Sequence, residues 1–356
     1  MKKERQSGID LLKVLAMVGV IILHYNNGSI GRAFALVPPH SMKACVLYGL
    51  ESMFICAVNV FMMISGYFMI GSKRIHAAKP IFLLIQVSVF QVFSYLLQIV
   101  FGGAALSAVG IVTHLVPASY FAVLYAAVYL LSPFVNKLLL SLKRRELNVL
   151  MALLSVLLSL WPYGVDVLER VSGYTFAGLS TIGMYGSQSG YTLIHFLFMY
   201  AIGAYIAIAQ VRCRRWVSGA VLCLCWAGLF VLSNLLVDLE LGAGLAWEYC
   251  NPLVILSAAA ALLLCKDLQV PHGRMLGSLS KATFAVYLLN PVLILLFVDT
   301  QTAVWGSGVG MLANIALSCA GICLFGWGMQ LLYDRLTQPV VHLVQKKWDM
   351  TLEMDR

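Results

Sequence analysis

The first apolar segment of the chain carries ionisable side chains that a membrane helix would place in lipid. It reads GIDLLKVLAMVGVIILHY and contains Asp10, Lys13 and His24. Lys13 and His24 are eleven positions apart, which places both side chains on one helical face, about 16 Å apart along the axis. Asp10 lies three positions before Lys13 and can neutralise it across one turn. A cation near the cytoplasmic end and a titratable imidazole near the outer end therefore line one stripe across half the bilayer, and ionisable groups at such depth are candidates for function.

Two interpretations of this stripe remain open. Taken singly, Lys13 can extend to the inner headgroups and His24 can sit at the outer interface without any chemical role. The shared face favours function, because histidine is well suited to take a proton from a hydroxyl near neutral pH. A structural role at position 24 would be filled more easily by Gln or Tyr.

The second apolar segment adds a carboxylate and an amide to the candidate site. Glu51 lies about as deep from the outer surface as His24, so it is a candidate to orient the imidazole and stabilise its charged form. The alternative is an interfacial Glu51 paired with Lys43 or Arg32. Asn59 follows in the same segment, and Ser65 and Gly66 are more typical of close helix packing than of catalysis.

Four polar residues are candidates for binding a substrate: Asn59, Tyr120, His195 and Asn290. His195 stands near the outer end of the sixth apolar segment. Tyr120 begins a series with Tyr125 and Tyr129, for which a core stripe is the default interpretation. Asn290 precedes Pro291, where repair of a proline kink is a stronger explanation than substrate contact.

The sequence gives no support for a metal centre. His24, His114 and His195 are expected on one side of the membrane, but no two of them have the i, i+3 or i+4 spacing of helical ligand pairs. The nine cysteines fall mostly inside apolar runs without a paired motif. We interpret them as small hydrophobic residues and predict no metal or redox chemistry.

Positioning these side chains requires a membrane scaffold, and the composition predicts one. Hydrophobic residues make up 61% of the 356 residues and charged residues 11%, with a mean hydropathy of +0.88, which excludes a soluble globular protein. Ten runs are about long enough to cross a bilayer, with the eighth the weakest. They are Ile9–Tyr25, Val46–Ile70, Ile81–Phe101, Ile111–Val135, Leu147–Tyr163, Tyr191–Ala209, Val217–Val237, Pro252–Cys265, Ala282–Val298 and Val309–Tyr333. We predict an all-α, polytopic bundle of about ten transmembrane helices, since a barrel would show short alternating strands.

Basic residues between the runs predict the orientation. With the N-terminus inside, twenty of the 24 Lys and Arg residues fall on the cytoplasmic side, three (Arg32, Lys43 and Arg170) fall outside, and Lys13 lies within the first helix. Both termini are therefore expected in the cytoplasm, with a transmembrane domain over residues 1–340 and a short cytoplasmic tail over 341–356. The net charge of +9 reflects this topology, and no nucleic-acid partner is expected.

Several of these segments resemble one known family. The opening GIDLLKVLAMVGVIILHY is similar to the first helix of the acyltransferase-3 family of membrane acyltransferases, in which an Asp precedes a basic residue followed by ten residues and a histidine. NVFMMISGYFMI, AVLYAAVYLLSPFVN and HFLFMYAIGAYIA resemble later helices of that family. The resemblance extends over essentially the whole chain.

The resemblance implies a transfer of acyl groups, usually acetyl from cytoplasmic acetyl-CoA, to hydroxyls of cell-surface or lipid-linked glycans. It implies that His24 is the catalytic residue and Lys13 its basic partner on the donor side. The basic loop with Lys73, Arg74 and Lys79 is expected to bind the nucleotide of CoA. Relatives often carry two basic residues three apart in that loop and a histidine where this chain has Asn290.

From these features we expect a multi-pass enzyme of a bacterial inner membrane that O-acetylates an envelope polysaccharide, with membrane lipid around it. Two other functions stay open at this point. A transporter or flippase could use Lys13 and His24 as a proton or substrate relay, and a non-catalytic sensor could share the fold.

Overall fold

The computed structural model describes residues 6–72, 74–76, 78–271, 273–347 and 351–353. Helices and the loops that join them make up the described chain apart from one short antiparallel ladder, in which β1 (Arg74–His76) pairs with β2 (Thr351–Glu353) and Ile75 lies opposite Leu352. The prediction of an all-α fold is confirmed.

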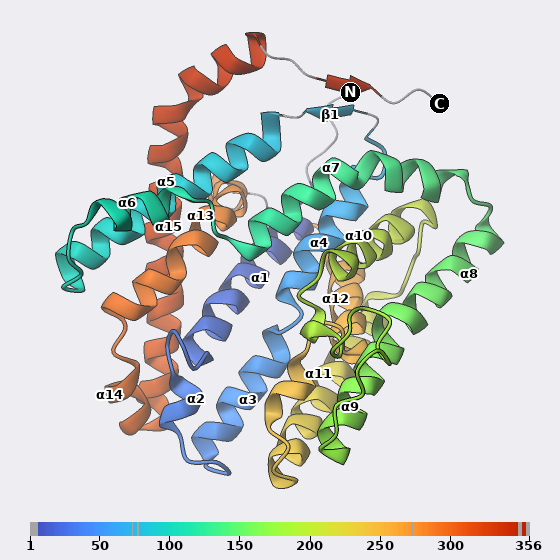
Figure 1. The fold of residues 1–356 in the computed structure, drawn as a ribbon, viewed down its shortest axis with the longest axis horizontal. Coiled ribbons are helices and arrows are strands. Elements are labelled where there is room, and N and C mark those ends of the chain that lie inside the picture. Colours follow the sequence, from blue (N-terminus) through green and yellow to red (C-terminus); the bar gives the residue numbers. More distant parts are fainter. Residues whose placement is uncertain (1–5, 73, 77, 272, 348–350, 354–356) are drawn as a thin grey trace. The chain divides into compact units, whose positions relative to one another are not determined.

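Figure 1 shows the order of the helices along the chain. They are α1 (Ser7–Asn26), α2 (Ala33–Leu36), α3 (Met42–Phe54), α4 (Ala57–Met69), α5 (Ala78–Phe101), α6 (Ala108–Leu115), α7 (Tyr120–Ser141), α8 (Arg144–Ser155), η1 (Val156–Leu160), α9 (Trp161–Ser172), η2 (Gln188–Gly190), α10 (Leu193–Ile208), α11 (Arg215–Asp238), η3 (Ala243–Trp247), α12 (Pro252–Cys265), α13 (Arg274–Phe297), α14 (Thr300–Trp305) and α15 (Gly308–Lys347). The helix α15 continues past residue 340, where the sequence places the start of a tail; that division remains a prediction.

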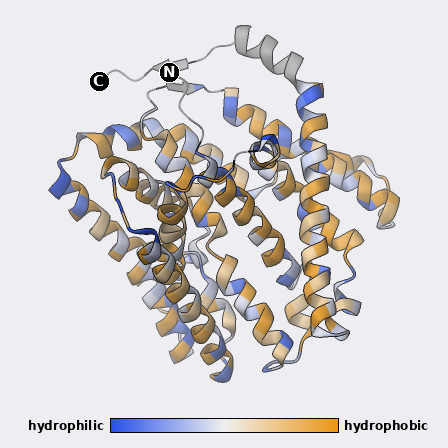
Figure 2. Ribbon diagram, turned by 180° about the vertical axis from the view of Figure 1, so that it is seen from behind, coloured by the Kyte–Doolittle hydropathy of each residue, from blue (hydrophilic) through white to orange (hydrophobic). Residues whose placement is uncertain are grey.

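The helices have the length and apolarity of membrane spans. Within the described residues, nine helical segments are long and apolar enough to cross a bilayer, and α10 is a tenth apolar helix of 16 residues. Apolar residues continue along most of their lengths (Figure 2). Every one of the ten predicted runs is therefore helical, and a polytopic helical membrane protein is confirmed.

Three predicted spans differ from single α-helices. The run Leu147–Tyr163 passes from α8 through the π-helix η1 into α9 without a break. The run Val46–Ile70 contains α3 and α4, which are separated at residues 55–56. The run Ile111–Val135 contains α6 and α7, because Pro117 lacks an amide hydrogen and disfavours helical geometry in the residue before it. Val116 accordingly has an extended backbone with φ −72° and ψ 123°.

The chain divides into two compact units. The first unit comprises residues 1–19, 48–72 and 131–271. In it α10 and α12 both pack on α4, and a Cβ at Gly66 would overlap the carbonyl oxygen of Tyr200, while one at Gly203 would overlap that of Met63. Glycines on both helices thus permit a close crossing, which confirms the packing interpretation of Gly66.

The second unit comprises residues 20–47, 73–130 and 272–356. Its centre is α13, which packs against α15 and α5. Pro291 lies inside α13, six residues before its last residue Phe297, and interrupts the helical hydrogen bonds there. This interruption lies beside the candidate active site.

Candidate active site

The candidate base, His24, contacts Asn290 within the second unit. His24 is in the last turn of α1 and is half-buried, while Asn290 of α13 is fully buried. The Nδ1 atom of His24 forms a short hydrogen bond with Oδ1 of Asn290. Two predicted site residues from opposite ends of the sequence are therefore brought together.

The hydrogen bonds of Asn290 fix the tautomer of His24. The amide nitrogen Nδ2 donates to the carbonyl oxygens of Val286 at 3.1 Å and Tyr287 at 2.7 Å. The Tyr287 carbonyl is the one that Pro291 leaves without a helical donor, so Asn290 repairs the kink as predicted. Because Nδ2 faces these carbonyls, Oδ1 faces the imidazole and accepts from Nδ1–H. The lone pair of the neutral imidazole then lies on Nε2.

Lys13 and His24 share the uninterrupted helix α1, so their predicted spacing of about 16 Å along one face holds. Lys13 is half-buried, and its Nζ lies 6.0 Å from the ring centroid of Phe68 in the first unit. Asp10 is only 5% exposed one turn earlier. The polar stripe of the first segment is thus built on a rigid helix.

Glu51 is buried on α3, with 8% of its surface exposed. In the second unit, the described contact of the imidazole is Asn290, so the role of Glu51 as an orienting group stays a prediction. Lys43, the alternative partner of Glu51, donates from Nζ to the carbonyl oxygens of Val304 and Gly306, both at 2.6 Å.

His195 and Asn59 form a second polar pair inside the first unit, and each is 1% exposed. Asn59 donates from Nδ2 to the carbonyl oxygen of Tyr249 at 2.9 Å, so its Oδ1 accepts from Nε2–H of His195 at 3.0 Å. The remaining Nδ1 atom of His195 is buried and has no described hydrogen-bond partner. A substrate role for the pair stays a prediction. In such a role, Nδ1 of His195 would be the atom that accepts a hydrogen bond from the substrate.

The predicted donor loop is described only in part. Lys73 lies outside the described residues, and only the backbone of Arg74 is described, in β1. Lys79 is exposed, with its Nζ 5.8 Å from the ring centroid of Tyr129, whose hydroxyl accepts from the backbone amide of His76 at 3.2 Å. The role of this loop stays a prediction.

Tyr120 is the first residue of α7 and is 38% exposed, so it does not belong to the core. Tyr125 and Tyr129 further along the helix are half-buried. The default core interpretation of this tyrosine series is therefore wrong for Tyr120, because the helix starts only there, after the break at Pro117.

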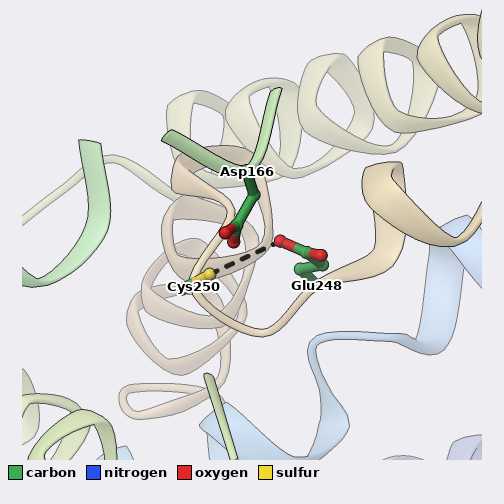
Figure 3. A group of neighbouring side chains, drawn as sticks. All are labelled: Asp166, Glu248 and Cys250. Carbon is green, nitrogen blue, oxygen red and sulfur yellow. Dashed lines mark hydrogen bonds between the residues drawn. The ribbon is translucent and has the colours of Figure 1, made fainter. Parts of the chain in front are cut away.

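Sequence reasoning missed a cluster of Asp166, Glu248 and Cys250 in the first unit (Figure 3). Their donor atoms lie within 4.8 Å of one another, close enough to hold a metal ion. Asp166 accepts from the amide of Ser187 at 2.9 Å, and the Cys250 thiol lies 3.8 Å from Oε2 of Glu248. The thiol of Cys250 thus makes a polar contact in a turn. Asp166 lies far in sequence from Glu248 and Cys250, so no short motif marks the three positions together.

The fold defines a polytopic helical membrane protein, in which His24 and His195 each form a hydrogen bond with an asparagine side chain. The sequence profile of a family described as an acyltransferase domain matches residues 6–333, nearly the whole chain. The chain therefore belongs to the acyltransferase-3 family and is a membrane acyltransferase. No curated protein and no solved structure matches it.

Proposed function

We propose that this membrane acyltransferase moves an acetyl group from cytoplasmic acetyl-CoA to a hydroxyl of a cell-surface or lipid-linked glycan, in the cytoplasmic membrane of a bacterium. The observation that carries the proposal is the His24 and Asn290 pair, because it leaves the imidazole with a basic Nε2 atom. Membership of the acyltransferase family supplies the reaction class.

In the proposed reaction, Nε2 of His24 takes the proton of the acceptor hydroxyl while the oxygen attacks the carbonyl carbon of the thioester. The carbon–sulfur bond breaks, the CoA thiolate leaves, and the imidazolium returns its proton to that sulfur. The same tautomer would also let Nε2 attack the thioester itself and carry the acetyl group transiently. Neither route needs a metal ion, and we propose that none takes part.

The remaining residues have proposed binding roles. Lys13 lies about 16 Å from His24 along α1, a distance of the same order as an extended pantetheine arm, and is proposed to face the donor. Lys73, Arg74 and Lys79 are proposed to attract the anionic nucleotide. Asn59, Tyr120 and His195 are proposed to contact the acceptor, with Glu51 acting on His24.

The test is a transfer assay in membrane vesicles. Vesicles containing the protein are incubated with acetyl-CoA labelled on the acetyl group, and the glycan fraction is then analysed for label. The proposal predicts label in the glycan and release of free CoA. Movement of glycan across the vesicle membrane without consumption of acetyl-CoA would instead indicate a transporter, and the absence of both would indicate a non-catalytic protein.

A further inference from the structure

A polar cavity of about 520 Å³ lies in the first unit, where α4, α10 and α12 end. It is lined by Tyr67 near the end of α4, Gln210 and Arg212 after α10, and Lys266 and Asp267 after α12. Its volume falls within the range of about 300–1,000 Å³ that is usual for small-molecule sites. By the predicted topology, these helix ends are cytoplasmic.

The cavity is surrounded by an excess of positive charge. Residues 212–215 and 266–267 contain four cations (Arg212, Arg214, Arg215 and Lys266) and one acid (Asp267), a net charge of 4 − 1 = +3. Lys266 is 8% exposed and lies 3.0 Å from Asp267, whose backbone carbonyl accepts from Arg215 at 2.6 Å. The carboxylate of Asp267 is thus paired with Lys266. The side chain of Arg212 is exposed and lines the cavity.

The start of α1 lies against the same segment. The hydroxyl of Ser7, in the first turn of α1, accepts from the amide of Val270 at 2.9 Å. Lys13 lies over Phe68, which is the neighbour of Tyr67 in the cavity lining. The helix that carries His24 therefore begins beside the basic cavity, and its N-terminal dipole adds to the positive potential there.

We propose that this cavity holds the phosphate groups of the acyl-CoA donor through direct contacts with Arg212 and Lys266, in addition to the attraction by charge proposed for Lys73, Arg74 and Lys79. This inference rests on the proposed function. Arginine presents a planar set of donors that matches phosphate oxygens, and lysine adds a compact positive charge. The exposed guanidinium of Arg212 can reach an incoming ligand, while the buried Lys266 lines the same cavity and is held in place by Asp267.

The test uses the purified full-length protein in phosphatidylcholine nanodiscs. Arg212→Gln and Lys266→Gln are compared with the control Arg214→Gln, which removes an exposed charge from the same loop but does not line the cavity. Loss of one charge-assisted hydrogen bond predicts about a tenfold or larger rise in the KM for acetyl-CoA, with kcat unchanged. Lys266→Arg, which keeps the charge, should restore most of the affinity if Lys266→Gln folds poorly.

A direct binding measurement separates this inference from the proposed function. It records the binding of labelled CoA and its displacement by adenosine 3′,5′-bisphosphate. The inference is supported if CoA binds the wild type and Arg214→Gln but binds Arg212→Gln about tenfold more weakly. This holds even if no acetyl transfer is found. Normal CoA binding by both cavity variants overturns the inference, even if transfer depends on His24. An effect of Arg212→Gln that appears only in phosphatidylglycerol nanodiscs also overturns it, because the cavity would then hold a lipid headgroup.

Discussion

Replacing Asn290 by Leu removes the acceptor that fixes the tautomer of His24. In the wild type, Oδ1 of Asn290 accepts from Nδ1 of the imidazole, while Nδ2 donates to the Val286 and Tyr287 carbonyls. Leucine has a similar volume but can neither hold Nδ1–H nor repair the helix. We therefore expect a lower kcat with little change in the KM for acetyl-CoA.

The size of the loss follows from the buried hydrogen bond. Leaving a buried donor without its acceptor costs about 1–3 kcal/mol, and each 1.36 kcal/mol changes a rate about tenfold. If that cost falls on the reactive tautomer, kcat should fall by about 5- to 150-fold. Histidine at this position can again partner Nδ1, so Asn290→His should retain more activity than Asn290→Leu.

A second substitution separates catalysis from folding. Pro291→Ala returns a backbone amide to the Tyr287 carbonyl, so the double variant Asn290→Leu, Pro291→Ala has an intact helix but no acceptor for His24. Pro291→Ala alone is the matched control and should keep near wild-type activity. The assay is the initial rate of labelled acetyl transfer in vesicles with matched protein amounts. A double variant as active as Pro291→Ala would refute the tautomer argument.

Other substitutions and treatments test the remaining parts of the structure. Asn59→Leu leaves His195 and a backbone carbonyl unpaired, so the thermal midpoint in detergent should fall by an amount equivalent to about 2 kcal/mol or more; an unchanged midpoint would contradict the buried pair. Gly203→Ala overlaps the Met63 carbonyl and should sharply reduce the yield of folded protein, whereas Gly219→Ala in α11 meets no atom within 4 Å and should be tolerated. Dialysis against a chelator should leave the transfer rate unchanged, and a loss restored by Zn²⁺ would instead point to the cluster of Figure 3.

The fold follows from local properties that a single sequence reveals. Length and apolarity of each run predict a membrane helix, because the bilayer core requires the backbone to be satisfied internally and the runs lack the short alternating pattern of barrel strands. Each of the ten predicted runs is helical as a result. The break between α6 and α7 could also be predicted, because Pro117 stands at that point. The break between α3 and α4 could not, because residues 55–56 include no proline or glycine.

The contacts within the site could not be predicted in the same way. The pairing of His24 with Asn290 spans 266 positions, and that of His195 with Asn59 spans 136, so only tertiary packing brings them together. Local chemistry did identify Asn290, because an amide beside Pro291 has an obvious backbone carbonyl to satisfy. The polar contact of Cys250 was not predicted, because nothing in the local sequence shows that the thiol of this buried residue lies close to Asp166 and Glu248.

The central claim is that Nε2 of His24 removes the proton from the acceptor or receives the acetyl group. The most direct measurement is the rate of labelled acetyl transfer by His24→Ala in vesicles, together with CoA binding by the same preparation. General base catalysis contributes about 10²–10⁴-fold, so we predict at least a hundredfold fall in kcat with CoA affinity within about twofold of the wild type. Transfer by His24→Ala within a few-fold of the wild-type rate would contradict the claim.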